Sequence, residues 1–329
     1  MLIEQQLSYA HVGVGVVDEY AATTLAAAAQ SSRLVAGRSN TAAQITNRAG
    51  KILHFGNYVT RLTVPVSRLL RRFSAWDHLR LGVTGGSYGN MLFETKCALG
   101  STSELTEDPE KRAPTDLPSM AASGAFWLED DGREPEMSLP RAELLATLPQ
   151  LDAAPQSIQR FRDVRGIGTL DEGFVGNVTR GARLSYQISA GRDCAPGHPV
   201  TCSQFVRVLD FAQRQVLTRM VQTPFPTAIV DMLSVVDSET MLFDRCRGED
   251  VLRIDLRVSI SNDLEALGTP AQDFTVVGVV DTVSEIHLER TNALVVASRT
   301  RKVIALPPVA QTLVKDAERM LRFYASHPR

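Results

Sequence analysis

In the stretch from Val251 to Ser261, VLRIDLRVSIS, apolar and polar residues alternate without a break from Leu252 onward. Successive side chains of a β-strand point to opposite faces of a sheet, so this alternation predicts a strand with one buried side and one solvated side. A sheet that faces water on one side is typical of antiparallel pairing. Further strand-like runs follow at 274–280, 283–289, 293–297 and 302–306. Because the turns between them are short, they predict a meander in the C-terminal third.

Three segments have the residue pattern of helices that would cover such a sheet. The segment 203–222 places apolar residues on one helical face, and Pro224 and Pro226 end it. The alanine-rich segment 18–32 predicts a helix that packs closely on a flat neighbour, and a closing helix follows Pro307 and Pro308. We therefore expect an α+β fold in which helices pack on one side of an antiparallel sheet, with long extended loops.

Composition divides the chain into three parts. Residues 1–100 are expected to form an N-terminal α/β unit, 101–160 a polar and acidic excursion with a short helix, and 161–329 a C-terminal α+β unit. Long polar excursions are expected at 33–51, 100–137 and 189–202, and loops of that length are usually functional or disordered. No internal repeat at the period of solenoid proteins is visible.

An arginine-bearing helix is predicted after Pro65. Val66, Leu69, Leu70 and Phe73 follow the i, i+3, i+4, i+7 spacing of one helical stripe, and Gly82 is a plausible end. The arginines that lie off this stripe form a candidate surface for nucleic acid or for a protein partner: Arg68, Arg71, Arg72 and Arg80. Arginine binds phosphates and carboxylates alike, and a solvated charged face is an equally weighted alternative.

Two glycine-rich segments, 82–90 and 166–181, are candidates for ligand-binding loops. A phosphate-binding P-loop requires Lys and Ser or Thr after its last glycine, whereas Asn90 and Met91 follow the first segment. A turn is therefore favoured there. In the second segment Asp171 and Glu172 are a candidate acid–base pair, but adjacent residues of an extended chain point to opposite faces.

The cysteines and acidic residues do not have the spacing of a metal site. Cys194 and Cys202 bracket His198, which leaves a zinc site open, but free cysteines are favoured because a fourth ligand is not visible. The acidic run at 129–136 lacks the ligand spacing of a calcium loop and predicts a solvated loop. We expect neither a metal nor a cofactor.

Charge and hydropathy restrict the protein's surroundings. Lys and Arg number 35 against 37 Asp and Glu, and this net charge of −2 argues against a simple electrostatic DNA binder. No run approaches the roughly 18 apolar residues of a membrane span, so no membrane partner is expected. The N-terminus has an acidic residue where a signal peptide requires positive charge. We expect an intracellular, cytoplasmic location or a place within a virus particle.

The functional expectation follows from the motifs that the sequence lacks. HExxH and a complete Walker A are absent, which favours a protein that is not an enzyme. The leading hypothesis is a structural subunit of a repetitive assembly, of capsid or filament type, whose partners are copies of itself and other subunits. One alternative is a nucleic-acid-binding subunit of a ribonucleoprotein that uses the arginine surface. The other is an enzyme with a site on the glycine-rich segments.

Overall fold

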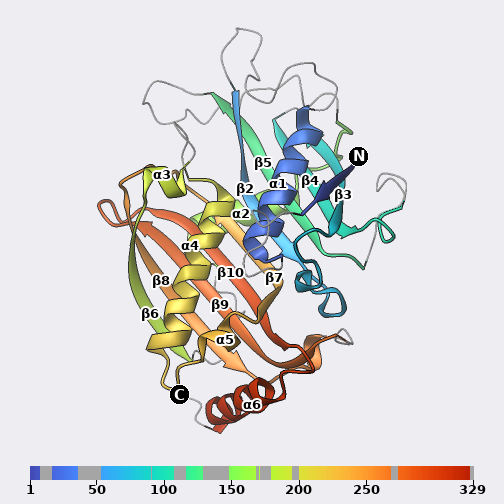
Figure 1. The fold of residues 1–329 in the computed structure, drawn as a ribbon. Coiled ribbons are helices and arrows are strands. Elements are labelled where there is room, and N and C mark those ends of the chain that lie inside the picture. The colour runs from blue at the N-terminus through green and yellow to red at the C-terminus, as the bar shows by residue number, and fades with distance from the viewer. Residues whose placement is uncertain are drawn as a thin grey trace.

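The computed structural model describes residues 1–7, 17–35, 53–89, 91–106, 116–128, 148–167, 170, 179–194, 200–267 and 273–326 (Figure 1). Its strands form a ten-stranded sheet in the order β1-β3-β4-β5-β2-β7-β10-β9-β8-β6, and each neighbouring pair is antiparallel. The predicted α+β class with an antiparallel sheet is confirmed.

The sheet consists of two halves with the same topology. The first contains β1 (Leu2–Gln6), α1 (Glu19–Val35), β2 (Leu53–Thr63), β3 (His78–Tyr88), β4 (Leu92–Ser101) and β5 (Ser119–Leu128). The second contains β6 (Arg180–Gln187), α4 (Cys202–Gln215), β7 (Leu233–Leu242), β8 (Val251–Ser261), β9 (Thr275–Leu288) and β10 (Leu294–Leu306). In each half the strands lie in the order first, third, fourth, fifth, second, counted from the outer edge. The chain is therefore a structural duplication.

The two halves join through β2 and β7, the innermost strand of each. Thr60 lies opposite Thr240 in this antiparallel pair, and Arg61 lies opposite Glu239. Backbone hydrogen bonds thus run through the junction as they do within each half, which makes one continuous sheet.

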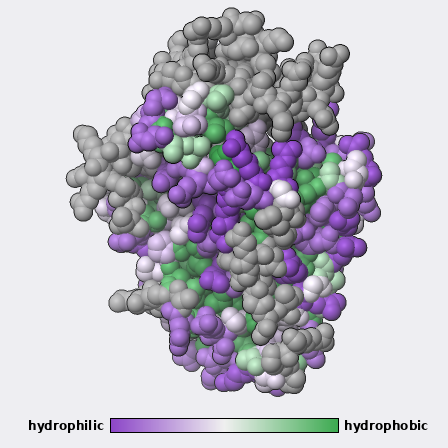
Figure 2. All heavy atoms as spheres, turned by 180° about the vertical axis from the view of Figure 1, so that it is seen from behind, coloured by the Kyte–Doolittle hydropathy of each residue, from purple (hydrophilic) through white to green (hydrophobic). Residues whose placement is uncertain are grey.

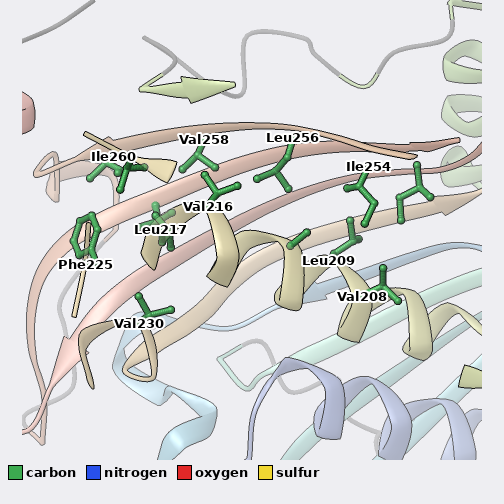
Figure 3. Packing of buried hydrophobic residues seen from close by; sticks show 14 of the residues in the cluster. Val208, Leu209, Val216, Leu217, Phe225, Val230, Ile254, Leu256, Val258 and Ile260 are labelled. Carbon is green, nitrogen blue, oxygen red and sulfur yellow. The ribbon is translucent and has the colours of Figure 1, made fainter. Parts of the chain in front are cut away.

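The long helices α1 and α4 lie on the same face of the sheet, which we call the inner face (Figure 1). Under α4, the inward residues of β8 meet the apolar side of the helix (Figure 3). The residues that Figure 3 labels on these two elements are Val208, Leu209, Ile254, Leu256, Val258 and Ile260. Under α1, small residues allow the close packing predicted from the sequence: Ala21, Ala22, Ala26 and Ala29 pack against Leu79, Leu81, Val83 and Leu99.

A third helix, α2 (Gln156–Ile167), lies on the opposite, outer face. Its Phe161 and Val164 pack on Val59, Met241 and Ala297, which alternate along their strands with inward-facing residues. The expectation that helices pack on one side only is therefore wrong. Away from α2 the outer face carries ion pairs such as Arg301 with Asp281, and Figure 2 shows hydrophilic residues across the middle of this face.

Shorter elements complete the fold: η2 (Val66–Arg68), η3 (Leu70–Arg72), α3 (Ala190–Asp193), α5 (Thr227–Val230) and η6 (Glu265–Leu267). After α4 the chain continues as a π-helical turn, η5 (Val216–Met220). The closing helix α6 (Gln311–Ser326) is confirmed, and its Ala317, Met320, Leu321 and Tyr324 pack into the core under α4. None of the helices in the described ranges is long and apolar enough to cross a membrane.

The predicted arginine-bearing helix is not formed. Leu69 is extended, with ψ 140°, and separates two 3₁₀ turns, η2 and η3. From His78 the chain is strand β3, because its backbone groups pair with both β1 and β4. The apolar stripe nevertheless identifies the buried side chains correctly, since Val66, Leu69, Leu70 and Phe73 all lie in the core of the first half.

Residues 82–88 of the first glycine-rich segment are strand rather than loop, because they pair along β4. Gly86 is required by packing: a Cβ there would lie 2.6 Å from Cδ2 of Leu151. The predicted strands after 261 fuse into the long β9 and β10. β8, β9 and β10 are sequential neighbours, but the sheet continues through β7 into the first half, so the predicted meander fits only roughly. Strand β5 was not predicted.

Candidate active site

Polar side chains gather on the inner face of the sheet, where the second half meets α1. Nine of them, with Val206 and Leu209 of α4, surround a cavity of about 10 Å³. They are Glu19 of α1, Asp210 and Gln213 of α4, Thr240 of β7, Thr282 and Ser284 of β9, and Ser298, Thr300 and Lys302 of β10. We call this space the central polar cavity. Its volume is close to that of one water molecule.

Local secondary structure directs the side chains that line this cavity. Asp18 is the N-cap of α1, since its Oδ1 accepts a hydrogen bond of 2.8 Å from the N–H of Ala21, and this puts Glu19 in the first turn. Asp210 and Gln213 are three residues apart on α4 and so share one side of the helix. Ser298, Thr300 and Lys302 alternate along β10, so all three point inward.

Lys302 is the charged centre of the cavity, and its side chain is only 5% exposed. Its Nζ lies 2.8 Å from Oδ1 of Asp210 and 3.5 Å from Oε2 of Glu19. Burial alone would lower the pKa of Lys302, but the two carboxylates outweigh it, so the pKa is raised and the ammonium stays charged.

The two carboxyl groups differ in their surroundings. Burial would raise the pKa of Asp210, but Lys302 and Arg214 hold it at about 2. Arg214 donates to Oδ2 of Asp210 from Nε at 2.7 Å. For Glu19 burial dominates over the effect of Lys302 and of a hydrogen bond from Ser238, so its pKa is raised. Environments that push the pKa values of two acids apart are a mark of acid–base sites.

Hydroxyl groups and one amide form the wall along the sheet. Gln213 donates from Nε2 to Oγ1 of Thr282 at 2.7 Å. Oγ1 of Thr240 lies 3.0 Å from Oγ of Ser298, which donates to the carbonyl of Glu239 at 3.1 Å. These bonds fix the rotamers of the groups around the cavity.

Ion pairs continue from the cavity towards the first half. Arg214 also pairs with Asp231, whose backbone carbonyl accepts a hydrogen bond from Arg71. Arg71 therefore points into the protein, where its Nη2 also lies 3.2 Å from Sδ of Met232. This chain of contacts links η3 of the first half to α4.

The other arginines of the predicted surface lie apart from the cavity. Arg68 and Arg72 both pair with Glu104, and Arg72 does so with both carboxylate oxygens. Burial would raise the pKa of Glu104, but Arg72 and Ser101 hold it at about 2. Arg80 donates to the carbonyl of Leu105 at 2.8 Å. Binding of a partner by these arginines stays a prediction.

The remaining candidates are not brought to the cavity. Asp171, Glu172 and His198 lie outside the described residues. Cys194 and Cys202 form no disulfide, and Sγ of Cys202 lies 3.2 Å from Oγ1 of Thr60. Within the described ranges no three His, Cys, Asp or Glu residues are close enough together to hold a metal ion.

A second hollow, of about 490 Å³, lies on the outer face between β6, β8 and β9. Its charged groups bind one another, as Arg183 does with Asp255 at 2.6 Å, and the hollow is open to solvent. Burial would raise the pKa of Asp255, but Arg183 and Arg253 lower it, which makes this carboxylate a weaker base. The central polar cavity is therefore the better candidate for chemistry.

No family model and no curated protein sequence matches this chain. Several solved structures, however, have a similar fold. A protein described as an oleoyl thioesterase from Lactobacillus plantarum aligns with 93% of this chain and 96% of its own, at TM-score 0.59 and 10% identity. The 12:0-ACP thioesterase from Umbellularia californica aligns with 92% of this chain and 93% of its own, at TM-score 0.54 and 12% identity.

An acyl-ACP thioesterase from Bacteroides thetaiotaomicron aligns with 92% of this chain and 97% of its own, at TM-score 0.50 and 8% identity. At these identities the likeness concerns the fold, which is that of two joined hot-dog units. The expectations of a capsid or filament subunit, of a ribonucleoprotein subunit and of a protein that is not an enzyme are corrected by this finding. The three structures that share this fold along almost the whole chain are described as thioesterases.

Proposed function

We propose that the protein is an acyl-thioester hydrolase that acts at the central polar cavity. The observation that carries this proposal is the cluster of Glu19, Asp210 and Lys302 between the two long helices, in which Lys302 and Glu19 are largely buried. The fold shared with three thioesterases supports the choice of reaction.

The cavity offers the groups that thioester hydrolysis requires. Glu19 is the general base: its raised pKa makes the carboxylate more basic than an ordinary glutamate. It removes a proton from water, whose oxygen attacks the thioester carbonyl carbon. The carbonyl oxygen becomes negative, and the charged ammonium of Lys302 stabilises it. When the C–S bond breaks, the thiolate takes the proton from Glu19, which leaves a carboxylic acid and a thiol.

Asp210 and Arg214 act through Lys302. The carboxylate of Asp210 keeps the ammonium charged and directs it towards Glu19, and Arg214 fixes Asp210. They are positioning residues in this scheme, because Asp210 stays ionised at any pH near neutrality.

A thiol-release assay on a panel of acyl-CoA thioesters tests the proposal. We expect the wild-type protein to hydrolyse at least one of them, and Glu19→Gln to lower kcat by roughly 100-fold or more, as for loss of a general base. Asp255→Asn, which removes a carboxylate from the outer face, is the matched control and should keep wild-type rates. Absence of hydrolysis across the panel, or full activity of Glu19→Gln, would refute the assignment.

The pH dependence of kcat/KM provides a second test. Only the ionised form of Glu19 accepts a proton, so activity should rise with pH as this group loses its proton. Because the pKa of Glu19 is raised, the acidic limb should lie above the pH of about 4.3 typical of glutamate. A rate that is constant down to pH 4 would contradict the role of Glu19.

A further inference from the structure

The sheet side of the central polar cavity carries hydroxyl groups where the neighbouring core carries hydrocarbon. Five hydroxyl side chains from three adjacent strands face it: Thr240, Thr282, Ser284, Ser298 and Thr300. Transfer of a hydroxyl group into an apolar interior is unfavourable unless the group is hydrogen-bonded. Thr240, Thr282 and Ser298 already form hydrogen bonds within the protein, so Ser284 and Thr300 are the two that favour a ligand able to form hydrogen bonds in return.

The core on both sides of the cavity is already filled. Under α4, large side chains from the helix and from β8 interdigitate (Figure 3). Under α1, alanines bring the helix close to the sheet. A pocket for a ligand of drug size has roughly 300–1,000 Å³. The central polar cavity has about 10 Å³, so any acyl group has to displace side chains, and a long alkyl chain has to displace more of them than a short group does.

The charged residues beside the cavity are the ones that solvent reaches. The side chains of Asp210 and Arg214 are 37% and 35% exposed, whereas that of Lys302 is 5% exposed. An acyl group that approaches from this side meets charges first and hydroxyl groups next. Each part of this route suits a polar group better than a hydrocarbon.

We propose, on the basis of the hydrolase function above, that the acyl group of the substrate is short and carries a hydroxyl or carbonyl substituent that Ser284 and Thr300 bind. A hydroxyl side chain both donates and accepts, so it pairs with either substituent. A plain alkyl group would leave these side chains without a partner, and sites built to bind a substrate hydroxyl discriminate strongly against analogues that lack it.

Hydrolysis of matched thioesters tests this substrate class. We expect kcat/KM for β-hydroxybutyryl-CoA to exceed those for butyryl-CoA and dodecanoyl-CoA by roughly 100-fold or more. Ser284→Ala and Thr300→Val should reduce this ratio at least tenfold. Ser259→Ala, on the outward side of β8, is the matched control and should leave the ratio unchanged. A preference for dodecanoyl-CoA or butyryl-CoA would overturn the substrate class and leave the hydrolase assignment intact.

Binding separates the two proposals when turnover is absent. Thioether analogues of β-hydroxybutyryl-CoA and butyryl-CoA cannot be hydrolysed, and their dissociation constants are measured by calorimetry. Tighter binding of the hydroxylated analogue, lost in Ser284→Ala and Thr300→Val, would support the substrate class even if the protein hydrolysed no thioester. Equal binding of both analogues would overturn it.

Discussion

At the scale of single residues, Lys302 is the most deeply buried of the three charged groups at the central polar cavity. Its ammonium is buried and is balanced by Asp210 and Glu19. Ions leave water at a high cost, and only close partners offset it. The three side chains are therefore coupled, and a change in one alters the charge state that the others hold.

Replacement of Lys302 should reveal this coupling as lost stability. We expect Lys302→Met to lower the free energy of unfolding by roughly 3–5 kcal/mol, because the largely buried carboxyl group of Glu19 loses its cation, whereas Asp210 keeps Arg214. Lys96→Met is the matched control: that side chain is 67% exposed and pairs with Glu94 only at 3.8 Å, so its replacement should cost less than about 1 kcal/mol. Denaturant titration measures both, and equal losses would show that Lys302 is not a buried ion-pair member.

The sequence contains a pattern that indicates the special position of Lys302, although it is not a catalytic motif. Along residues 296–306 the inward positions of β10 are apolar at Val296 and Ile304 but polar at Ser298, Thr300 and Lys302. The two predicted strands, 293–297 and 302–306, leave out residues 298–301. They therefore hide this interruption, which one continuous strand reveals. Glu19 carried no such signal, because an acid in the first turn of a helix is explained by the helix dipole.

At the scale of elements, the strands fit one another closely at their glycines. Gly124 of β5 is the extreme case, since a Cβ there would lie 1.9 Å from the carbonyl oxygen of Gly56 on β2 and 2.8 Å from the ring of Phe93. Gly181 of β6 has nothing within 4 Å of the same position. The requirement for glycine is therefore a property of particular strand contacts.

This contrast predicts opposite effects of one substitution. Gly124→Ala should destabilise the protein by roughly 1–3 kcal/mol or more, because backbone rather than a flexible side chain must move. Gly181→Ala should be neutral or slightly stabilising, since alanine reduces the freedom of the unfolded chain. Thermal unfolding of both variants provides the comparison. Similar melting temperatures would contradict the packing of β5 against β2.

Local sequence patterns predicted the secondary structure correctly where the tertiary packing favours the same structure. They failed where pairing with distant strands requires a different one. The alternation of 251–261 corresponds residue for residue to β8. The stripe from Val66 to Phe73 has helical spacing but forms two 3₁₀ turns, because the chain must enter β3 and pair with β1 and β4. Strand pairing depends on residues distant in sequence, so no local pattern could reveal it.

At the scale of the molecule, the two halves share both a sheet and a core. The cluster under α1 contains residues of the second half, including Val235, Val276 and Val303. The duplication itself was invisible in the sequence, because a sheet topology can repeat without a repeat of residues. Shared burial predicts that neither half unfolds alone.

Amide hydrogen exchange measures this cooperativity. Leu62→Ala, in β2 at the junction, should cost about 2–5 kcal/mol and reduce the protection of β4 and of β9 equally. Val309→Ala, at a side chain that is 91% exposed, is the control and should leave both strands unchanged. Loss of protection in β4 alone would mean that the halves unfold independently.

Because β2 and β7 join the two halves within one chain, the two halves are free to differ in sequence. Two identical subunits that met through these strands would carry two equivalent centres, and every substitution would appear in both. A single chain has no such constraint, and here the two halves contribute unequally: α1 supplies Glu19, whereas the other residues that line the cavity belong to α4, β7, β9 and β10 of the second half. The second half thus holds most of the site, and the first half completes it with one carboxyl group. A titrating ligand for the cavity should accordingly saturate at one equivalent per chain.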